Sequence, residues 1–284
     1  MAVYANAQED FAINSQPDIV YAEVDDKALM LDLYTPEGVE APKLLVWVHG
    51  GAWRTMTRKS RPTQSVVDAF VPAGYAVASV EFRQSTEARF PAQIHDIKAA
   101  LRFLRAEQEQ LGVDAERIIA MGNSSGGHLV AVLAVSNSAA GLDQLQGAVG
   151  EHLDQSSDVQ GVVSYYGGSN LTSILGQSTP HGLGVRQPAL DLLIGGQPDV
   201  ATELATLASP ALHVSEHSVP LLLLHGDQDP QMPINQSHEL HGAYKAEGLD
   251  VHFEVVHGAA HGGALFHDAP RNAVVVDFAQ RILR

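Results

Sequence analysis

Residues 118–134 read IIAMGNSSGGHLVAVLA, and this stretch decides the fold. It starts as a short apolar run typical of a strand, and from Gly126 onward it continues as an apolar helix. Gly122 to Gly126 fit the pattern G-x-S-x-G, in which a sharp turn from strand to helix lifts the central serine above the edge of the sheet. The stretch therefore makes Ser124 the candidate nucleophile.

The glycines on both sides of this turn have a steric reason to be there. In such an elbow, strand and helix approach so closely that a Cβ at Gly122 or Gly126 would clash. The helix that follows Ser124 also points its first backbone amides at any negative charge formed there. Ser125 is a competing hydroxyl, but the helix has begun at that position, so we assign it an amide-donor role. Taken alone, the pattern equally fits a plain glycine-rich turn.

Composition excludes several classes of function. The 284 residues carry a net charge of −16, which would repel nucleic acid and anionic lipid. We expect a soluble globular protein, because no apolar run approaches the roughly 18 residues that a membrane span needs. The absence of cysteine excludes disulfides and thiolate chemistry. Ala5-Asn6-Ala7 resembles the end of a secretory signal, so the compartment is either cytoplasmic or extracytoplasmic, and the oligomeric state is not readable.

Strand and helix patterns alternate along the chain. We expect a loose arm over residues 1–17 and a single α/β domain over residues 18–284. Alternation of apolar and polar residues on both sides of Asp25-Asp26-Lys27 predicts a hairpin. Residues 171–217 interrupt the alternation of strands and helices, and we predict a lid-like insertion there. Further strands are predicted at 43–48, 76–80, 161–166, 220–225 and 251–256, with helices at 63–73, 91–110, 235–247 and 269–283. This order predicts a mostly parallel sheet of about eight strands, with helices on both faces and ligands at the carboxyl ends of the strands.

A serine nucleophile needs a base that is itself oriented by a carboxylate. Asp229 follows the strand at 220–225, where the turn would aim its carboxylate inward, and the rival Asp227 reads as a turn residue. His261 follows the strand at 251–256 and is the candidate base, whereas His257 reads as a structural loop residue. The order Ser, Asp, His is the one associated with the nucleophile elbow.

The oxyanion of acyl transfer needs at least two N–H donors. His49-Gly50-Gly51-Ala52-Trp53 follows the strand at 43–48, and we expect the amides of Gly51, Ala52 and Ser125 to form the hole. A plain β-turn is the alternative for this segment. Four aromatic residues near strand ends could line an acyl pocket or belong to the core, and of these we select Trp53 as the substrate-binding residue; the others are Tyr165, Tyr166 and Phe266.

Together, VHGGAW, GNSSGGHLV, HGDQDPQMP and HGAAHGG resemble the α/β-hydrolase superfamily, specifically carboxylesterases with an HGG-type oxyanion motif. Residues 80–133 look like bacterial esterases related to acetyl and feruloyl esterases that act on plant polysaccharides. The resemblance implies Ser124 as nucleophile, Asp229 as orienting acid, His261 as base and a mechanism without a metal. The third glycine of the fuller H-G-G-G motif is Ala52 here, where a positive φ would be costly.

The expected substrate is a short-chain or aromatic carboxylic ester, either small or linked to a carbohydrate. The form H-G-G-x-W also resembles arylformamidases, so a formamide or a peptide-like amide is an alternative. A ligand-binding module without catalysis is the alternative from another class. We predict no metal and no cofactor, because the 14 histidines give no H-E-x-x-H pattern and the glycine-rich turn lacks a P-loop lysine.

Overall fold

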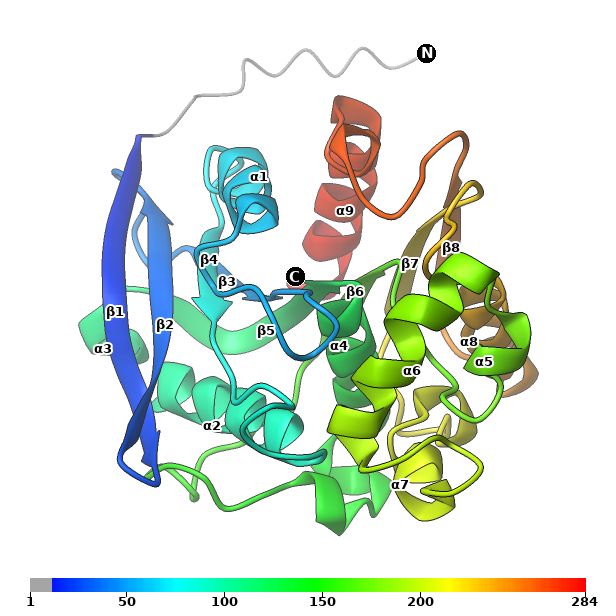
Figure 1. Ribbon diagram of the computed structural model, residues 1–284. Helices are drawn as coiled ribbons and strands as arrows, with labels where there is room; N and C mark the ends of the chain where they lie inside the picture. Colours follow the sequence, from blue (N-terminus) through cyan, green and yellow to red (C-terminus); the bar gives the residue numbers. More distant parts are fainter. Residues whose placement is uncertain (1–11) are drawn as a thin grey trace.

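The computed structural model describes residues 12–284, which form an α/β structure around one sheet. Eight strands of the described residues make this sheet, in the order β1-β2-β4-β3-β5-β6-β7-β8 (Figure 1). The strands are β1 (Ile13–Val24), β2 (Lys27–Pro36), β3 (Lys43–Val48), β4 (Ala76–Val80), β5 (Asp114–Asn123), β6 (Gly161–Tyr165), β7 (Leu221–Gly226) and β8 (Val251–Val256). The predicted strand count and fold class are confirmed.

The sheet is parallel except at one edge. β1 pairs with β2 and β2 with β4 in antiparallel fashion, while every pairing from β4 to β8 is parallel. In a parallel sheet the carboxyl ends of the strands share one edge, so the segments that follow β3, β5, β7 and β8 are brought together there.

The first strand corrects the expected arm over residues 1–17. β1 begins at Ile13 and pairs with β2 from Ile13↔Pro36 onward, so residues 13–17 belong to the sheet. Their side chains are exposed, and the strand is held there by backbone hydrogen bonds and not by apolar burial, which is why no hydrophobic pattern revealed it. Residues 1–11, including Ala5-Asn6-Ala7, lie outside the described residues. The predicted hairpin turn at Asp25 and Asp26 is confirmed.

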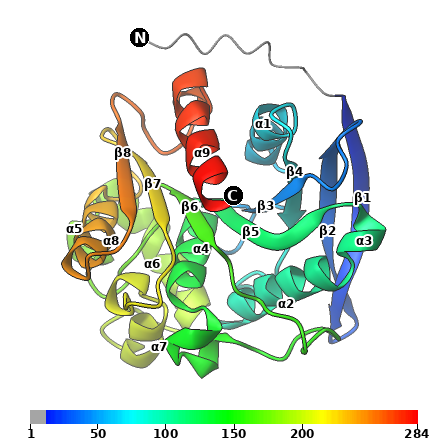
Figure 2. The ribbon, with the colours of Figure 1, turned by 180° about the vertical axis from the view of Figure 1, so that it is seen from behind.

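Helices cover both faces of the sheet. The helices are α1 (Arg61–Phe70), α2 (Ala92–Ala106), α3 (Gln108–Leu111), α4 (Ser125–Val135), α5 (Ile174–Gln177), α6 (Pro180–Ile194), α7 (Thr202–Leu207), α8 (Asn235–Ala246) and α9 (Ala269–Ile282). Figures 1 and 2 show α1 and α9 together on one side of the sheet and α2 and α4 on the other. The single helix predicted at 91–110 is two helices in the structure. The first, α2, ends at Ala106, and the short α3 begins at Gln108.

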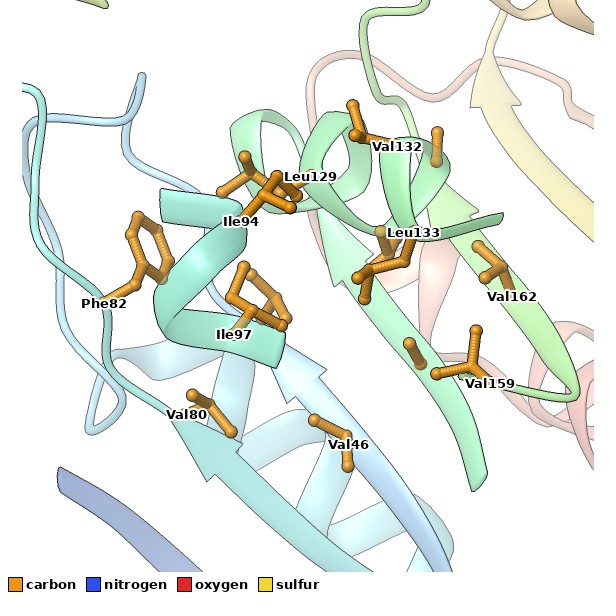
Figure 3. Packing of buried hydrophobic residues seen from close by; sticks show 14 of the residues in the cluster. Val46, Val80, Phe82, Ile94, Ile97, Leu129, Val132, Leu133, Val159 and Val162 are labelled. Atoms are coloured by element: carbon orange, nitrogen blue, oxygen red, sulfur yellow. The ribbon is translucent and has the colours of Figure 1, made fainter. Parts of the chain in front are cut away.

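Two apolar cores follow from this layering. The larger contains α2, α4 and α8, and the smaller contains α1 and α9. In Figure 3, Ile94 of α2 lies beside Leu129 of α4, and both helices pack over strands that carry Val46 and Val162. Every residue of α4 is buried, which explains why this helix is apolar on all sides and lacks an amphipathic stripe.

The insertion at 171–217 lies between β6 and β7 and contains α5, α6 and α7. The insertion is largely helical, and α6 ends at Ile194, where the C-cap Gly195 adopts the left-handed conformation. In the part of the chain that the structure describes, no helix has both the length and the apolarity needed to cross a bilayer.

Candidate active site

Ser124 occupies a strained turn between β5 and α4. Its backbone angles are φ 53° and ψ −118°, a conformation that a residue with a side chain rarely adopts. A Cβ on Gly122 would lie 2.6 Å from the carbonyl carbon of Gly126, and one on Gly126 would lie 2.1 Å from the carbonyl oxygen of Val48. Only glycine fits at both positions, so the steric argument made for the G-x-S-x-G pattern holds in the structure.

The three residues of the predicted triad form one hydrogen-bonded chain. The His261 Nδ1 to Asp229 Oδ2 distance is 2.7 Å, and the His261 Nε2 to Ser124 Oγ distance is 2.8 Å. An ionised carboxylate only accepts hydrogen bonds, so Nδ1 carries the proton and Nε2 is left to accept from the Ser124 hydroxyl. This is the arrangement in which an imidazole can remove the serine proton.

Asp229 is ionised and fully enclosed. Burial alone would raise its pKa, but hydrogen bonds from His225 and His261 hold the pKa of this carboxyl well below its usual value of 3.8. Its second oxygen, Oδ1, accepts the backbone N–H groups of Gln231 and Met232, both at 2.8 Å. His225 lies behind the carboxylate, with its Nε2 3.4 Å from Oδ2.

The rival residues Asp227 and His257 pair with each other outside the site. Their contact between Nδ1 and Oδ2 is 2.8 Å, and the His257 side chain is 83% exposed. The other competitor, Ser125, is the first residue of α4, and its buried hydroxyl finds no hydrogen-bond partner among the described residues. The geometry thus separates Ser124, Asp229 and His261 from each of their alternatives.

The predicted oxyanion segment lies opposite the elbow. Gly51 has φ 110° and Ala52 has φ 53°, so Ala52 does adopt the positive φ that is costly for a residue with a side chain. Within residues 12–284, the backbone amides of Gly51 and Ala52 appear in no hydrogen bond, and Ser125 contributes an amide from the first turn of α4, where no intrahelical acceptor exists. Gly51 and Ala52 line the same cavity as Ser124, and Ser125 is its neighbour in the chain, so these three amides are the candidate donors of an oxyanion hole.

Trp53 does not line the cavity, which corrects its selection as the substrate-binding residue. Its side chain is 1% exposed, and its indole Nε1 donates to Nδ1 of His128 at 3.1 Å. His128 in turn bonds the Ala208 carbonyl through Nε2 at 2.7 Å, and burial lowers the pKa of this histidine to about 4, so it is neutral. Trp53, itself at φ 60°, thus anchors the strained backbone that follows Ala52 to helix α4.

A cavity of about 410 Å³ opens over Ser124 and His261. Of the four aromatic residues considered, Tyr166 lines this cavity, and Trp53, Tyr165 and Phe266 do not. The Tyr166 ring packs edge-on against His261 with 4.8 Å between centroids, and burial raises the pKa of Tyr166 to about 12. Its φ of 40° is positive, as are those of Ser124 and Ala52, so it is another strained position of the site.

Several contributing residues were missed from the sequence. Asn123 accepts the Gly50 N–H through Oδ1 at 2.9 Å, which ties the elbow to the oxyanion segment. Val185 of α6 lies in the cavity lining, so the insertion does reach the site. The position of Asn123 next to Ser124 was a signal that could have been used, whereas nothing in the sequence points to Val185.

No group of three or more His, Cys, Asp and Glu side chains within residues 12–284 is arranged to hold a metal ion. The groups that hydrogen bonds bring together at this site are the Ser124 hydroxyl, the His261 imidazole and the Asp229 carboxylate.

The sheet order, the strained serine and the Ser–His–Asp chain define a protein of the α/β-hydrolase class. The chain belongs to the BD-FAE family, whose model matches residues 31–244. It is 29% identical over 258 residues to the esterase LipC of Mycobacterium tuberculosis, covering 86% of this chain and 59% of that protein. The chain thus spans little more than half of this relative.

Two solved structures are also similar to this chain. A truncated carbohydrate esterase from gut microbiota superposes with a TM-score of 0.86 at 29% identity, over 97% of this chain and 98% of that one. A bifunctional GH43-CE protein of Bacteroides eggerthii gives a TM-score of 0.82 at 31% identity, over 94% of this chain and 35% of the other. The fold therefore extends over nearly the whole chain.

Proposed function

We propose that this protein is a serine esterase that hydrolyses short-chain or aromatic carboxylic esters, of acetyl or feruloyl type, through an acyl-enzyme on Ser124. The observation that carries the proposal is the hydrogen-bonded chain from Ser124 through His261 to the buried Asp229. The names of the relatives support it, since one is called an esterase and another a carbohydrate esterase. A carbohydrate-linked ester is accordingly the substrate class that we favour.

In the first half of the reaction, Ser124 Oγ attacks the ester carbonyl while His261 Nε2 takes the hydroxyl proton. The carbonyl oxygen becomes an oxyanion, which accepts the amide N–H groups of Gly51, Ala52 and Ser125. Asp229 stabilises the imidazolium through Nδ1–H. The imidazolium then gives its proton to the departing alcohol oxygen, and the acyl group remains on Ser124.

In the second half, His261 removes a proton from water, and the hydroxide attacks the acyl-enzyme carbonyl at the same oxyanion site. Collapse of this intermediate releases the carboxylic acid, and the proton returns from His261 to Ser124. No cofactor takes part in either half.

The cavity sets the size of the acyl group. A volume of about 410 Å³ is at the small end of the range for ligand pockets. The cavity is lined by apolar side chains of Met56, Pro62 and Val185 and by polar side chains of Thr55 and Gln231. This mixture favours a short or singly aromatic acyl group attached to a polar alcohol.

The experiment is hydrolysis of a p-nitrophenyl acyl series from acetate to decanoate, together with methyl ferulate, by the wild type and by Ser124→Ala. We expect wild-type turnover to be greatest with short acyl or feruloyl groups, and the variant to lose at least about 10⁴-fold in kcat because its nucleophile is absent.

Substantial turnover by Ser124→Ala would place the nucleophile elsewhere. If the wild type hydrolyses no ester but cleaves an aryl formamide, the ester proposal fails. Thermal unfolding of both proteins serves as the control that the substitution leaves the fold intact.

A further inference from the structure

The cavity over Ser124 contains one permanently charged side chain, Arg54. It lies two residues beyond Ala52, and its backbone N–H donates to the Gly51 carbonyl at 3.1 Å. The guanidinium therefore projects from the same tight turn that supplies two of the proposed oxyanion amides. Whatever part of a substrate occupies this wall would lie close to the reacting carbonyl.

Arg54 stands apart from the basic residues that follow it. Arg58, four residues later, is buried and bonded to the carboxylates of Asp18, Asp32 and Glu81, and Lys59 pairs with Asp18 at 2.8 Å. Within the described residues, the Arg54 guanidinium has no ion pair and no hydrogen bond, and Arg54 as a residue is half-buried. Its donors are available to a ligand.

The charge around Arg54 is unusual for this protein. The chain carries 33 acidic residues and a net charge of −16. Among the described residues that line the cavity, however, none is an aspartate or a glutamate, and Asp229 is sealed behind His261. An anionic substrate would be repelled by the molecule as a whole. At this wall it would meet a guanidinium with no competing carboxylate.

We propose that Arg54 selects esters that carry a carboxylate group near the scissile bond, on either the acyl or the alcohol part. The inference rests on the proposed esterase function and adds a substrate class to it. The planar guanidinium has a fork of N–H donors that matches a carboxylate, and a charge-assisted bidentate pair formed in a partly desolvated cavity is among the strongest polar contacts. Thr55, the next residue, and Gln231 supply neutral groups for the remainder of the substrate.

The test compares matched neutral and anionic esters. On the acyl side, mono-p-nitrophenyl adipate is paired with p-nitrophenyl hexanoate. On the alcohol side, 4-acetoxybenzoate is paired with 4-acetoxybenzamide. For each pair the readout is the ratio of kcat/KM for the anionic ester to that for the neutral ester, so that a general loss of activity cancels.

We expect Arg54→Gln to lower this ratio by about 10- to 100-fold in one pair, because a hydrogen bond to a charged group is lost. The pair that responds identifies the part of the substrate that carries the carboxylate. Arg54→Lys should lower the ratio less, since the charge remains without the fork. Arg61→Gln is the matched control, because Arg61 is exposed next to Pro62 but lies outside the cavity lining.

An unchanged ratio in both pairs for Arg54→Gln would overturn the inference while leaving the esterase proposal intact. An equal fall for Arg61→Gln would also overturn it, because the effect would then be one of general charge. If the wild type hydrolyses none of the four esters, the proposed function itself fails.

Discussion

Two Asp–His pairs in this molecule make nearly the same contact but differ in burial and in what surrounds them. Asp229 and His261 meet at 2.7 Å, with side-chain exposures of 0% and 15%. Asp227 and His257 meet at 2.8 Å, with exposures of 30% and 83%. Both aspartates follow β7 and both histidines follow β8, so chemistry and contact distance do not distinguish the pairs.

What distinguishes them is what lies on the far side of each imidazole. The Nε2 atom of His261 faces Ser124 at 2.8 Å within the cavity, while His257 faces solvent. Around Asp229 the protein supplies two backbone amides and His225, which hold the carboxylate ionised in a place where water cannot screen it. The same Asp–His contact is therefore suited to the proposed catalytic role in one place and not in the other, because of the groups that surround it.

The largest effect on kcat is expected from a substitution that breaks the buried Asp229–His261 pair. Asp229→Asn should lower kcat by about 10⁴-fold, because the amide stabilises the wrong imidazole tautomer and cannot balance an imidazolium. Asp227→Asn, which alters the exposed pair in the same way, should change kcat by less than about twofold. Steady-state hydrolysis of p-nitrophenyl acetate measures both. Equal losses in the two variants would mean that the assignment of the acid to Asp229 is wrong.

The next largest effect is expected on the free energy of unfolding at acidic pH, through Asp229. The pKa of Asp229 is lowered in the folded protein, so its contribution to stability is fully present above the unfolded value of 3.8 and is lost as the pH falls below it. One such group changes the unfolding free energy by up to about 1.4 kcal/mol per pH unit. We expect urea unfolding between about pH 5 and pH 3 to show a shallower pH dependence for Asp229→Asn than for the wild type.

The exposed pair is again the control for this measurement. The pKa of Asp227 is also lowered, first by the hydrogen bond from His257 and then by the Gly258 amide, but solvent screens both contacts. The Asp227→Asn protein should therefore follow the wild-type curve closely. If both substitutions change the pH dependence of the unfolding free energy equally in acid, burial is not what makes the Asp229 carboxylate different.

The smallest effect on kcat is expected from a change in the contacts of His128, a histidine buried away from the cavity. Trp53→Phe removes the hydrogen bond to His128 that anchors the strained backbone after Ala52. We expect kcat to fall about fivefold, the equivalent of roughly 1 kcal/mol, with KM nearly constant, because the oxyanion contact is strongest in the transition state.

Trp47→Phe is the matched variant for this experiment. Trp47 is equally buried, but its indole N–H has no partner among the described residues. It should lose packing energy and thermal stability without the drop in kcat. If both variants lower kcat to the same extent, loosening of the core explains the result, and the Trp53–His128 contact has no positioning role.

Much of this architecture could be read from local patterns. Apolar runs located β3 and β4 at the bounds that the structure shows, because a strand buried on both faces is almost entirely apolar. The elbow could be read because the G-x-S-x-G pattern lies within five consecutive residues, although the contact that requires glycine at Gly126 is with Val48 of β3. The first residues of β1 could not, since exposed polar side chains held only by backbone pairing give no hydrophobic signal.

The sequence by itself determined the alternation of strands and helices, the sharp turn at Ser124, and a short list of acids and bases after β7 and β8. Only the tertiary structure showed Asp229 bonded to His261 and Asp227 outside the site, removed Trp53 from the cavity and left Arg54 without a partner among the described residues. The physical reason is that residue type and spacing determine which groups are near a strand end. Burial and partners depend on segments far apart in the chain, such as α6 and α4, that meet only in the folded protein.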